Sequence, residues 1–217
     1  MKKAEAAEIS QKFVAIQAPN FKMMTYEVVG TAPLVMNKFS QKAREIMTAK
    51  QASGSQSKKG AKREGKDFDA CYEGAFHRSR EGWAGIPAAA FRAAMISACK
   101  LVGFHMTIGK LAIFVEADGF DADEGTPLVR ILGDEPKRVE LPVRNATGVV
   151  DIRVRPMWEK WNCKLQIRYD ADMFDSESLT NLLARAGLQV GILEGRPDSK
   201  KSCGMGWGMF QLGPVPR

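Results

Sequence analysis

The sequence lacks the patterns by which common active sites are recognised. Its four cysteines, Cys71, Cys99, Cys163 and Cys203, are isolated, and no C-x-x-C pair occurs. Neither a zinc site nor a disulfide framework is therefore indicated, and we expect reduced, structural thiols. Only two histidines are present, and no spacing of serine, histidine and aspartate indicates a nucleophilic enzyme. The residues alone predict no catalytic centre, no metal and no cofactor.

Long apolar runs are also missing. No stretch approaches the roughly 20 apolar residues that a membrane span needs. The start, MKKAEAAEIS, has two lysines but no apolar segment behind them. We therefore expect no secretory signal, no membrane partner and a cytoplasmic protein. With 217 residues, of which 45% are hydrophobic, the chain is long enough for one domain with a sizeable core.

Positive charge is what the chain has in excess. The formal net charge is +7 and the isoelectric point is about 9.3, which favours polyanionic partners such as nucleic acid. The segment from Lys38 to Lys66 carries nine basic and two acidic residues, an excess equal to that of the whole chain. Its centre, KQASGSQSKKGAKREGK, has little to bury, so we expect a mobile loop. The loop is either a solvated linker or a polyanion-binding arm, and its one-sided charge favours the arm.

Strand and helix patterns alternate along the rest of the chain. We predict strands at about 24–29, 110–118, 126–132, 163–170 and 207–212, and helices at 85–103 and 176–191. A basic stretch interrupted by Pro142, Asn145 and Gly148 predicts an extended hairpin arm over 134–161. Strand, helix, strand, strand, helix, strand is the split βαβ order. We therefore predict one α+β domain over 1–217, with a ferredoxin-like, RNA-recognition-motif-like palm, a basic insertion at 38–80 and this arm.

A glycine-rich segment, EGRPDSKKSCGMGWGMFQ, occupies residues 194–211. Glycines allow a backbone to approach a phosphate chain closely and to point N–H groups at it. Arg196, Lys200 and Lys201 would supply charge, and Trp207 a stacking face. The alternative is a hairpin turn whose two aromatic residues belong to the core. We assign Phe210 to the core and the loop itself to ligand contact.

Two motifs resemble the RAMP superfamily, the repeat-associated proteins that form the backbone of CRISPR effector complexes. GIPAAAFRAA at 85–94 is similar to the isoleucine, proline, glycine, serine, serine, leucine, arginine signature that opens the family's first helix. GRPDSKKSCGMGWGMFQL at 195–212 resembles its glycine-rich loop before the last strand. Both motifs lie in the family's order, and the predicted elements match along nearly the whole chain.

The departures from the family pattern bear on function. Alanines at 88–90 replace the family's glycine and serines, so hydroxyl contacts to phosphate are absent there. Backbone subunits of the target-cleaving branch carry an aspartate after the first strand, and the loop TAPLVMNKFS at 31–40 has none. The resemblance therefore implies binding without cleavage.

Residues and resemblance together predict a non-catalytic protein that binds single-stranded nucleic acid and oligomerises head-to-tail along it, as the backbone of a helical complex. The resemblance favours RNA over DNA and other effector-complex subunits as further partners. The candidate nucleic-acid-binding residues are Lys38, Lys42, Arg44, Lys58, Lys59, Lys62, Arg63, Arg92, Arg144, Arg153, Arg155, Arg196, Lys200, Lys201, Gly204, Gly206 and Trp207.

Three alternatives remain open at the level of the sequence. One is a metal-independent RAMP endoribonuclease with His77 or His105 as general base, of which His77, beside Arg78 and Arg80, is the better candidate. The second is a guide-free protein that coats or anneals single strands. The third is a mimic of a backbone subunit that inhibits a CRISPR complex.

Overall fold

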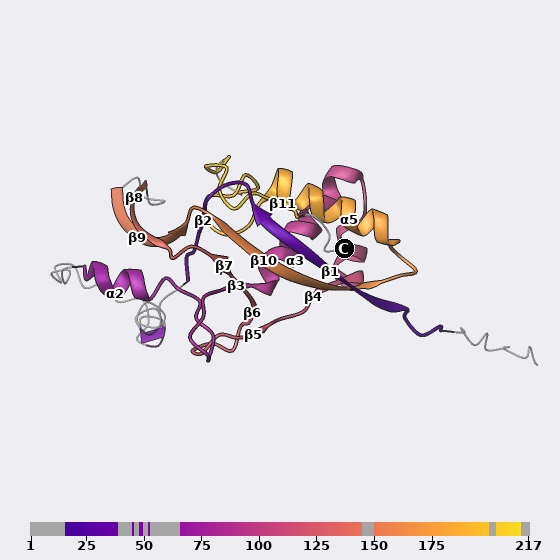
Figure 1. Cartoon of the computed structure of the whole chain (residues 1–217), viewed down its shortest axis with the longest axis horizontal. Helices are drawn as coiled ribbons and strands as arrows, with labels where there is room; N and C mark the ends of the chain where they lie inside the picture. The colour runs from indigo at the N-terminus through magenta and orange to yellow at the C-terminus, as the bar shows by residue number, and fades with distance from the viewer. Residues whose placement is uncertain are drawn as a thin grey trace, which may run out of the picture.

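The computed structural model describes residues 16–38, 45, 48–49, 52, 66–144, 150–199 and 203–213. Most of the basic loop predicted between Lys38 and Lys66 lies outside these ranges. The described chain is of the α+β class with antiparallel sheets, as the sequence predicts (Figure 1). None of its helices combines the length and the apolarity that crossing a membrane requires.

The largest sheet has the strand order β11 (Phe210–Leu212), β1 (Phe21–Gly30), β10 (Trp161–Asp170), β4 (Ile113–Val115). All three pairings are antiparallel, and β1 and β10 pair along nearly their whole lengths. β7 (Leu132–Gly133) pairs with the start of β10. Because successive strand residues point to opposite faces, Tyr26 and Val28 are buried while Thr25 and Glu27 are exposed. One face of the sheet is therefore core and the other is wet.

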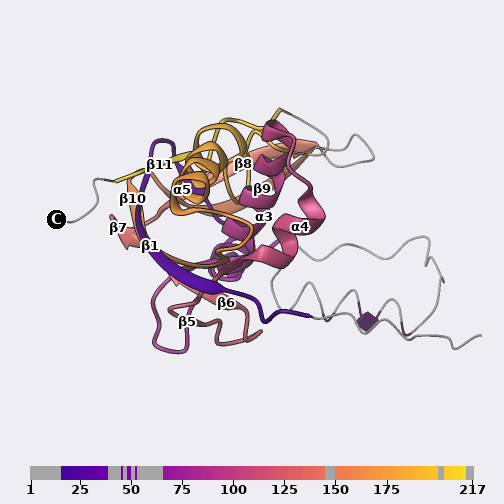
Figure 2. The ribbon, with the colours of Figure 1, turned by 90° about the vertical axis from the view of Figure 1, so that its right-hand side faces the viewer.

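The helices α3 (Ala88–Ala98) and α5 (Ser176–Arg185) cover the buried face of the sheet (Figure 2). Alanine-rich α3 buries Phe91, Met95 and Ala98 along one stripe, and the ring of Phe91 meets that of Phe210 edge-on at 5.6 Å. A 3₁₀ turn (Cys99–Val102) and the short helix α4 (Met106–Ala112) follow α3, and a π turn (Ala186–Val190) follows α5. Phe210 is completely buried, so its assignment to the core is confirmed.

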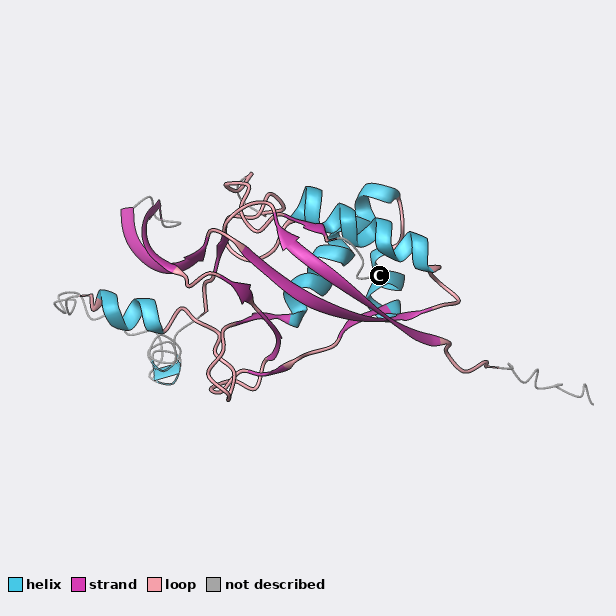
Figure 3. Ribbon diagram, in the orientation of Figure 1, coloured by secondary structure: helices cyan, strands magenta, loops and turns pink. Residues whose placement is uncertain are grey.

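Two smaller sheets extend the domain. β2 (Leu34–Val35) pairs with β9 (Val150–Trp158), which forms a long hairpin with β8 (Lys137–Arg144). This hairpin projects away from α3 and α5 (Figure 3). β3 (Gly85–Pro87), β6 (Pro127–Arg130) and β5 (Gly119–Phe120) form the other sheet. The short helix α2 (Phe68–Glu73) packs beside β9. The strands β8 and β9 lie within the range 134–161 that the sequence predicts for a hairpin arm.

Three predicted boundaries are wrong. The residues Gly85–Pro87 form β3, so α3 begins at Ala88, because extended Pro87 precedes it and Ile86 pairs with Val129. The predicted strand at 110–118 is shortened to β4, because the residues Lys110–Ala112 complete α4. The last strand begins at Phe210 rather than at 207, since the preceding glycines adopt left-handed turns.

Candidate nucleic-acid interface

Two loop segments, 191–199 and 203–209, pack on one another into a double loop between the hairpin β8–β9 and helix α5 (Figure 1). The N–H groups of Met205 and Trp207 both donate to the carbonyl of Gly195, at 2.7 and 3.2 Å, and the N–H of Ile192 donates to the carbonyl of Gly208 at 3.0 Å. Gly208 donates in turn to the carbonyl of Pro33 at 2.8 Å. These hydrogen bonds fix the double loop to the end of β1 and to the start of β2.

The glycines of the double loop allow this close packing. Gly204 and Gly208 both have φ +67°, and a Cβ there would lie 2.1 Å from the carbonyl oxygen of Arg196 and 1.9 Å from that of Ile192, respectively. The N–H groups of Met205, Trp207 and Gly208 are engaged within the protein. Gly204 and Gly208 therefore allow the two segments of the double loop to pack together. Close approach to a phosphate chain, which the sequence predicts for this loop, would be a second role.

The first hollow lies between the double loop and β9 and has a volume of about 380 Å³. Glu194 lies beside two arginines of β9: its carboxylate is 3.2 Å from Nε of Arg155 and 3.8 Å from Nη1 of Arg153. Arg196 enters from the double loop. The residues that line this hollow are Asn37, Arg153, Leu193, Glu194, Gly195, Arg196 and Ser199.

The second hollow lies on the other side of the same loop, against α3, and has a volume of about 480 Å³. Its floor is mainly apolar, with Ala90 and Ala93 on α3 facing Ile192 and Leu193. Lys100, Lys110 and Arg196 contribute cations, and Asp198, which accepts a hydrogen bond from the Ser97 hydroxyl, contributes a carboxylate. Ala90 gives this wall an apolar methyl group.

Leu193 and Arg196 line both hollows, which therefore flank one loop segment. We call the two hollows and the segment 193–196 between them the groove. Its lining carries four cations, Lys100, Lys110, Arg153 and Arg196, against the carboxylates of Glu194 and Asp198. An excess of cations along a concave surface is what a phosphate backbone requires.

Several predicted site residues meet at this groove. Arg153 and Arg196 line it, and Arg155, whose side chain is 14% exposed, contacts Glu194 from β9. Trp207 is half-buried, with its indole packed over Gly195. Gly204 and Gly206 belong to the adjoining loop, both with left-handed backbone.

Other predicted residues lie elsewhere or outside the description. Arg92 reaches the edge of β4, where it donates to the carbonyls of Ile113 and Lys110 and stacks over Phe114 at 4.8 Å. Arg144 ends β8, and its side chain is outside the described part. Predictions at Lys42, Arg44, Lys58, Lys59, Lys62, Arg63, Lys200 and Lys201 also fall outside the described residues.

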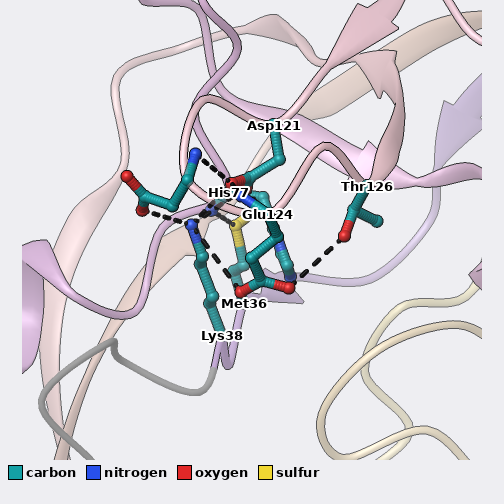
Figure 4. A network of polar contacts seen from close by, with 7 residues as sticks. Met36, Lys38, His77, Asp121, Glu124 and Thr126 are labelled. Carbon is teal, nitrogen blue, oxygen red and sulfur yellow. Dashed lines mark hydrogen bonds and ion pairs between the residues drawn. The ribbon is translucent and has the colours of Figure 1, made fainter. Parts of the chain in front are cut away.

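Lys38 is buried rather than presented to a ligand. Its ammonium lies 2.8 Å from Oδ1 of Asp121 and 2.7 Å from Oδ2 of Asp123, with Glu124 at 3.9 Å (Figure 4). Its side chain is 4% exposed and that of Asp121 is completely buried. A buried lysine is stable only where carboxylates pair with it, which is the arrangement here. This placement removes Lys38 from any exposed phosphate-binding surface.

His77 belongs to the same network, with Nδ1 2.9 Å from Oδ2 of Asp121. Burial by itself raises the pKa of Asp121, but hydrogen bonds from Lys38 and His77 outweigh it, so the net pKa lies below the usual range. Potential ligand atoms of His77, Asp121 and Glu124 lie within 4.8 Å of one another. Because the Lys38 ammonium already contacts both carboxylates, it repels a divalent cation, and we assign no metal to this cluster.

Sequence reasoning missed two features of this region. The ion pair between Lys38 and Asp121 joins residues more than 80 positions apart, so no local sequence pattern predicts it. Leu193 adopts φ +59°, a conformation that a leucine in a sequence does not signal. The exposure of Lys100, which lines the second hollow, follows from the sequence, because this residue lies off the apolar stripe of the helix predicted at 85–103.

No protein-family model matches this chain, and a search of curated proteins finds no relative.

Proposed function

We propose that this protein binds single-stranded nucleic acid, preferably RNA, without cleaving it, and assembles head-to-tail along the strand. The observation that carries the proposal is the groove, which has four cations and lies between the hairpin arm, α3 and the glycine-rich double loop. Arginine and lysine would neutralise phosphates there, while the apolar wall along α3 would accept a base or a sugar.

The arrangement of the main sheet supports a ferredoxin-like palm of the RAMP kind. The four strands on the main path of this sheet and the two helices that cover it follow one another along the chain as β1, α3, β4, β10, α5, β11, with the other elements inserted between them. In the sheet, the first and third of these strands, β1 and β10, lie at the centre. Such a palm, with a hairpin arm and a basic insertion, corresponds to a backbone subunit of a CRISPR effector complex. Because a fold hosts many functions, the groove carries more of the argument than the topology does.

Assembly follows from the number of contact surfaces. A hairpin arm, a basic insertion and a groove offer more surface than a short stretch of strand requires, so part of it would contact the next copy. A head-to-tail contact that does not close generates a helix. Mass photometry on RNA of increasing length tests this: stoichiometry should rise with length, whereas one copy at every length contradicts assembly.

A metal-independent nuclease is the second candidate, because Asp121 holds Nδ1 of His77 as a general base requires. Against it, the His77 side chain is only 12% exposed and shares Asp121 with Lys38. Incubation of labelled RNA with the protein in EDTA separates the two functions: intact, bound RNA supports the proposal. Shortened RNA, with cleavage abolished by His77→Asn, supports the nuclease.

Sequencing the nucleic acid that co-purifies with the protein distinguishes the remaining readings. A uniform guide supports a backbone subunit, with other effector subunits as partners. A random mixture supports guide-free coating or annealing of single strands. The mimic is tested separately, because it would lower the activity of an intact CRISPR complex to which the protein is added.

A further inference from the structure

Leu193 has an unusual backbone conformation for a residue that carries a side chain. Its φ of +59° is the only positive value at a non-glycine position among the described residues. The left-handed conformation is unfavourable for an L-residue, and such strain is found at ligand clamps where the surrounding structure imposes it. Here the neighbours are fixed, because Ile192 donates to the Gly208 carbonyl at 3.0 Å and Glu194 to the Val35 carbonyl at 3.3 Å.

This conformation places Leu193 on the ridge between the two hollows of the groove. The hollow toward β9 is mainly polar, with Asn37 and Arg153, whereas the hollow toward α3 is mainly apolar. Arg196 borders both hollows, and its Nη1 donates to the Leu193 carbonyl at 3.0 Å. A strand that follows the cations from one hollow to the other must therefore cross a partly exposed leucine.

Minor-groove-binding proteins insert apolar side chains, leucine among them, between stacked bases of duplex DNA, and an apolar side chain at this crossing can make the same contact with a single strand. We propose that Leu193 separates two adjacent bases of the bound strand, and that one of them enters the apolar hollow beside Ala90 and Ala93. The inference rests on the proposed function and names two subsites within the same groove.

The chemistry of the apolar hollow fits a base better than it fits another ligand. Its volume of about 480 Å³ lies within the range of ligand pockets, roughly 300–1,000 Å³. Lys100, Lys110 and Arg196 at its border match the phosphates on either side of an inserted base. The Ser97 hydroxyl is already bonded to Asp198, so the wall offers little to read a base edge. Any of the four bases would be accepted.

The test uses single-stranded RNA oligonucleotides that carry one 2-aminopurine, placed at successive positions in the series. The fluorescence of this base rises when it loses its stacking partner. We expect a rise on binding at the position over Leu193, and loss of that rise in Leu193→Gly, which suits the left-handed backbone. Affinity should fall by roughly five- to 150-fold, the range that the loss of one stacked base covers.

Two further variants make the result specific. Ala93→Leu fills the hollow from an exposed position on α3 and should also abolish the rise, while Leu188→Ala, at an exposed leucine outside the groove, should keep it. A bound strand without a rise at any position overturns this inference alone, and so does a full rise in Leu193→Gly. An RNA that does not bind overturns the proposed function together with the inference.

Discussion

The ammonium of Lys38 lies 2.8 Å from Oδ1 of Asp121, and the two side chains are 4% and 0% exposed. Lys38 is the first residue of the predicted insertion at 38–80, and the Asp121 carboxylate also contacts His77 near the end of that insertion. One buried carboxylate therefore joins both sides of this insertion to the loop after β5. We interpret the network as the anchor of the insertion.

The Lys38→Met substitution tests this anchor, because it leaves Asp121 buried without its ammonium. The free energy of unfolding should fall by about 3–5 kcal/mol, as for other broken buried pairs. Urea denaturation measures the loss. Lys137→Met is the matched control, since its ion pair with Glu159 is exposed and contributes about 1 kcal/mol or less. Equally small losses in both variants would show that Lys38 does not anchor the insertion.

Acid should weaken the same network. The pKa of Asp121 is lower in the folded protein than in the unfolded chain, since the contacts with Lys38 and His77 outweigh burial. The contribution of Asp121 to the free energy of unfolding is complete above the unfolded pKa of about 3.9 and is lost as the pH falls through the lower folded pKa. Denaturation curves between about pH 5 and about pH 2 should show a smaller acid-induced loss in the free energy of unfolding in Asp121→Asn than in the wild type. Equal acid-induced losses of stability in the variant and the wild type would show that groups other than Asp121 cause the acid sensitivity.

Arg196 should contribute to binding through phosphate neutralisation. Arg196→Ala should weaken binding of RNA of any sequence, and should reduce the slope of log affinity against log salt by roughly 0.7 per lost phosphate contact. Fluorescence anisotropy across a salt series measures both effects. Lys164→Ala, at an exposed position on the wet face of the main sheet, should leave the slope unchanged. An equal effect of the two variants would indicate nonspecific charge rather than the groove.

Cysteine reactivity reports on the glycine-rich double loop. Cys203 is exposed there, whereas Cys99 and Cys163 are buried, and burial raises the pKa of both thiols. In a Cys71→Ser background, a maleimide should modify Cys203 first, and saturating RNA should slow that modification. Mass spectrometry of digests follows each site. Unchanged labelling of Cys203 in the presence of bound RNA would place the strand away from the double loop.

The sequence predicts the main sheet and the hairpin arm well, because both have local signatures. Alternation along 163–170 corresponds to β10, and the arm was marked by a basic stretch with turn residues at its centre. The start of α3 was misplaced, since Pro87 suits the first turn of a helix as well as the end of a strand. Only pairing with β6, distant in the sequence, decides between them.

The candidate site was predicted less completely. The charges of Arg153, Arg155 and Arg196 were visible in the sequence, and the structure brings these residues to one groove or its border. The same reasoning included Lys38, because charge in a sequence does not reveal burial. The ridge at Leu193 depends on hydrogen bonds to Gly208 and Val35, which only the folded chain brings together.

The central claim is that the protein holds a single strand electrostatically without cutting it. The affinity for end-labelled single-stranded RNA in EDTA, measured across a series of salt concentrations, tests this claim most directly. The account predicts intact RNA and tight binding at low salt, with log affinity falling linearly against log salt by roughly 0.7 per phosphate neutralised. An affinity that is the same at low and high salt, or RNA that is shortened in EDTA, would contradict it.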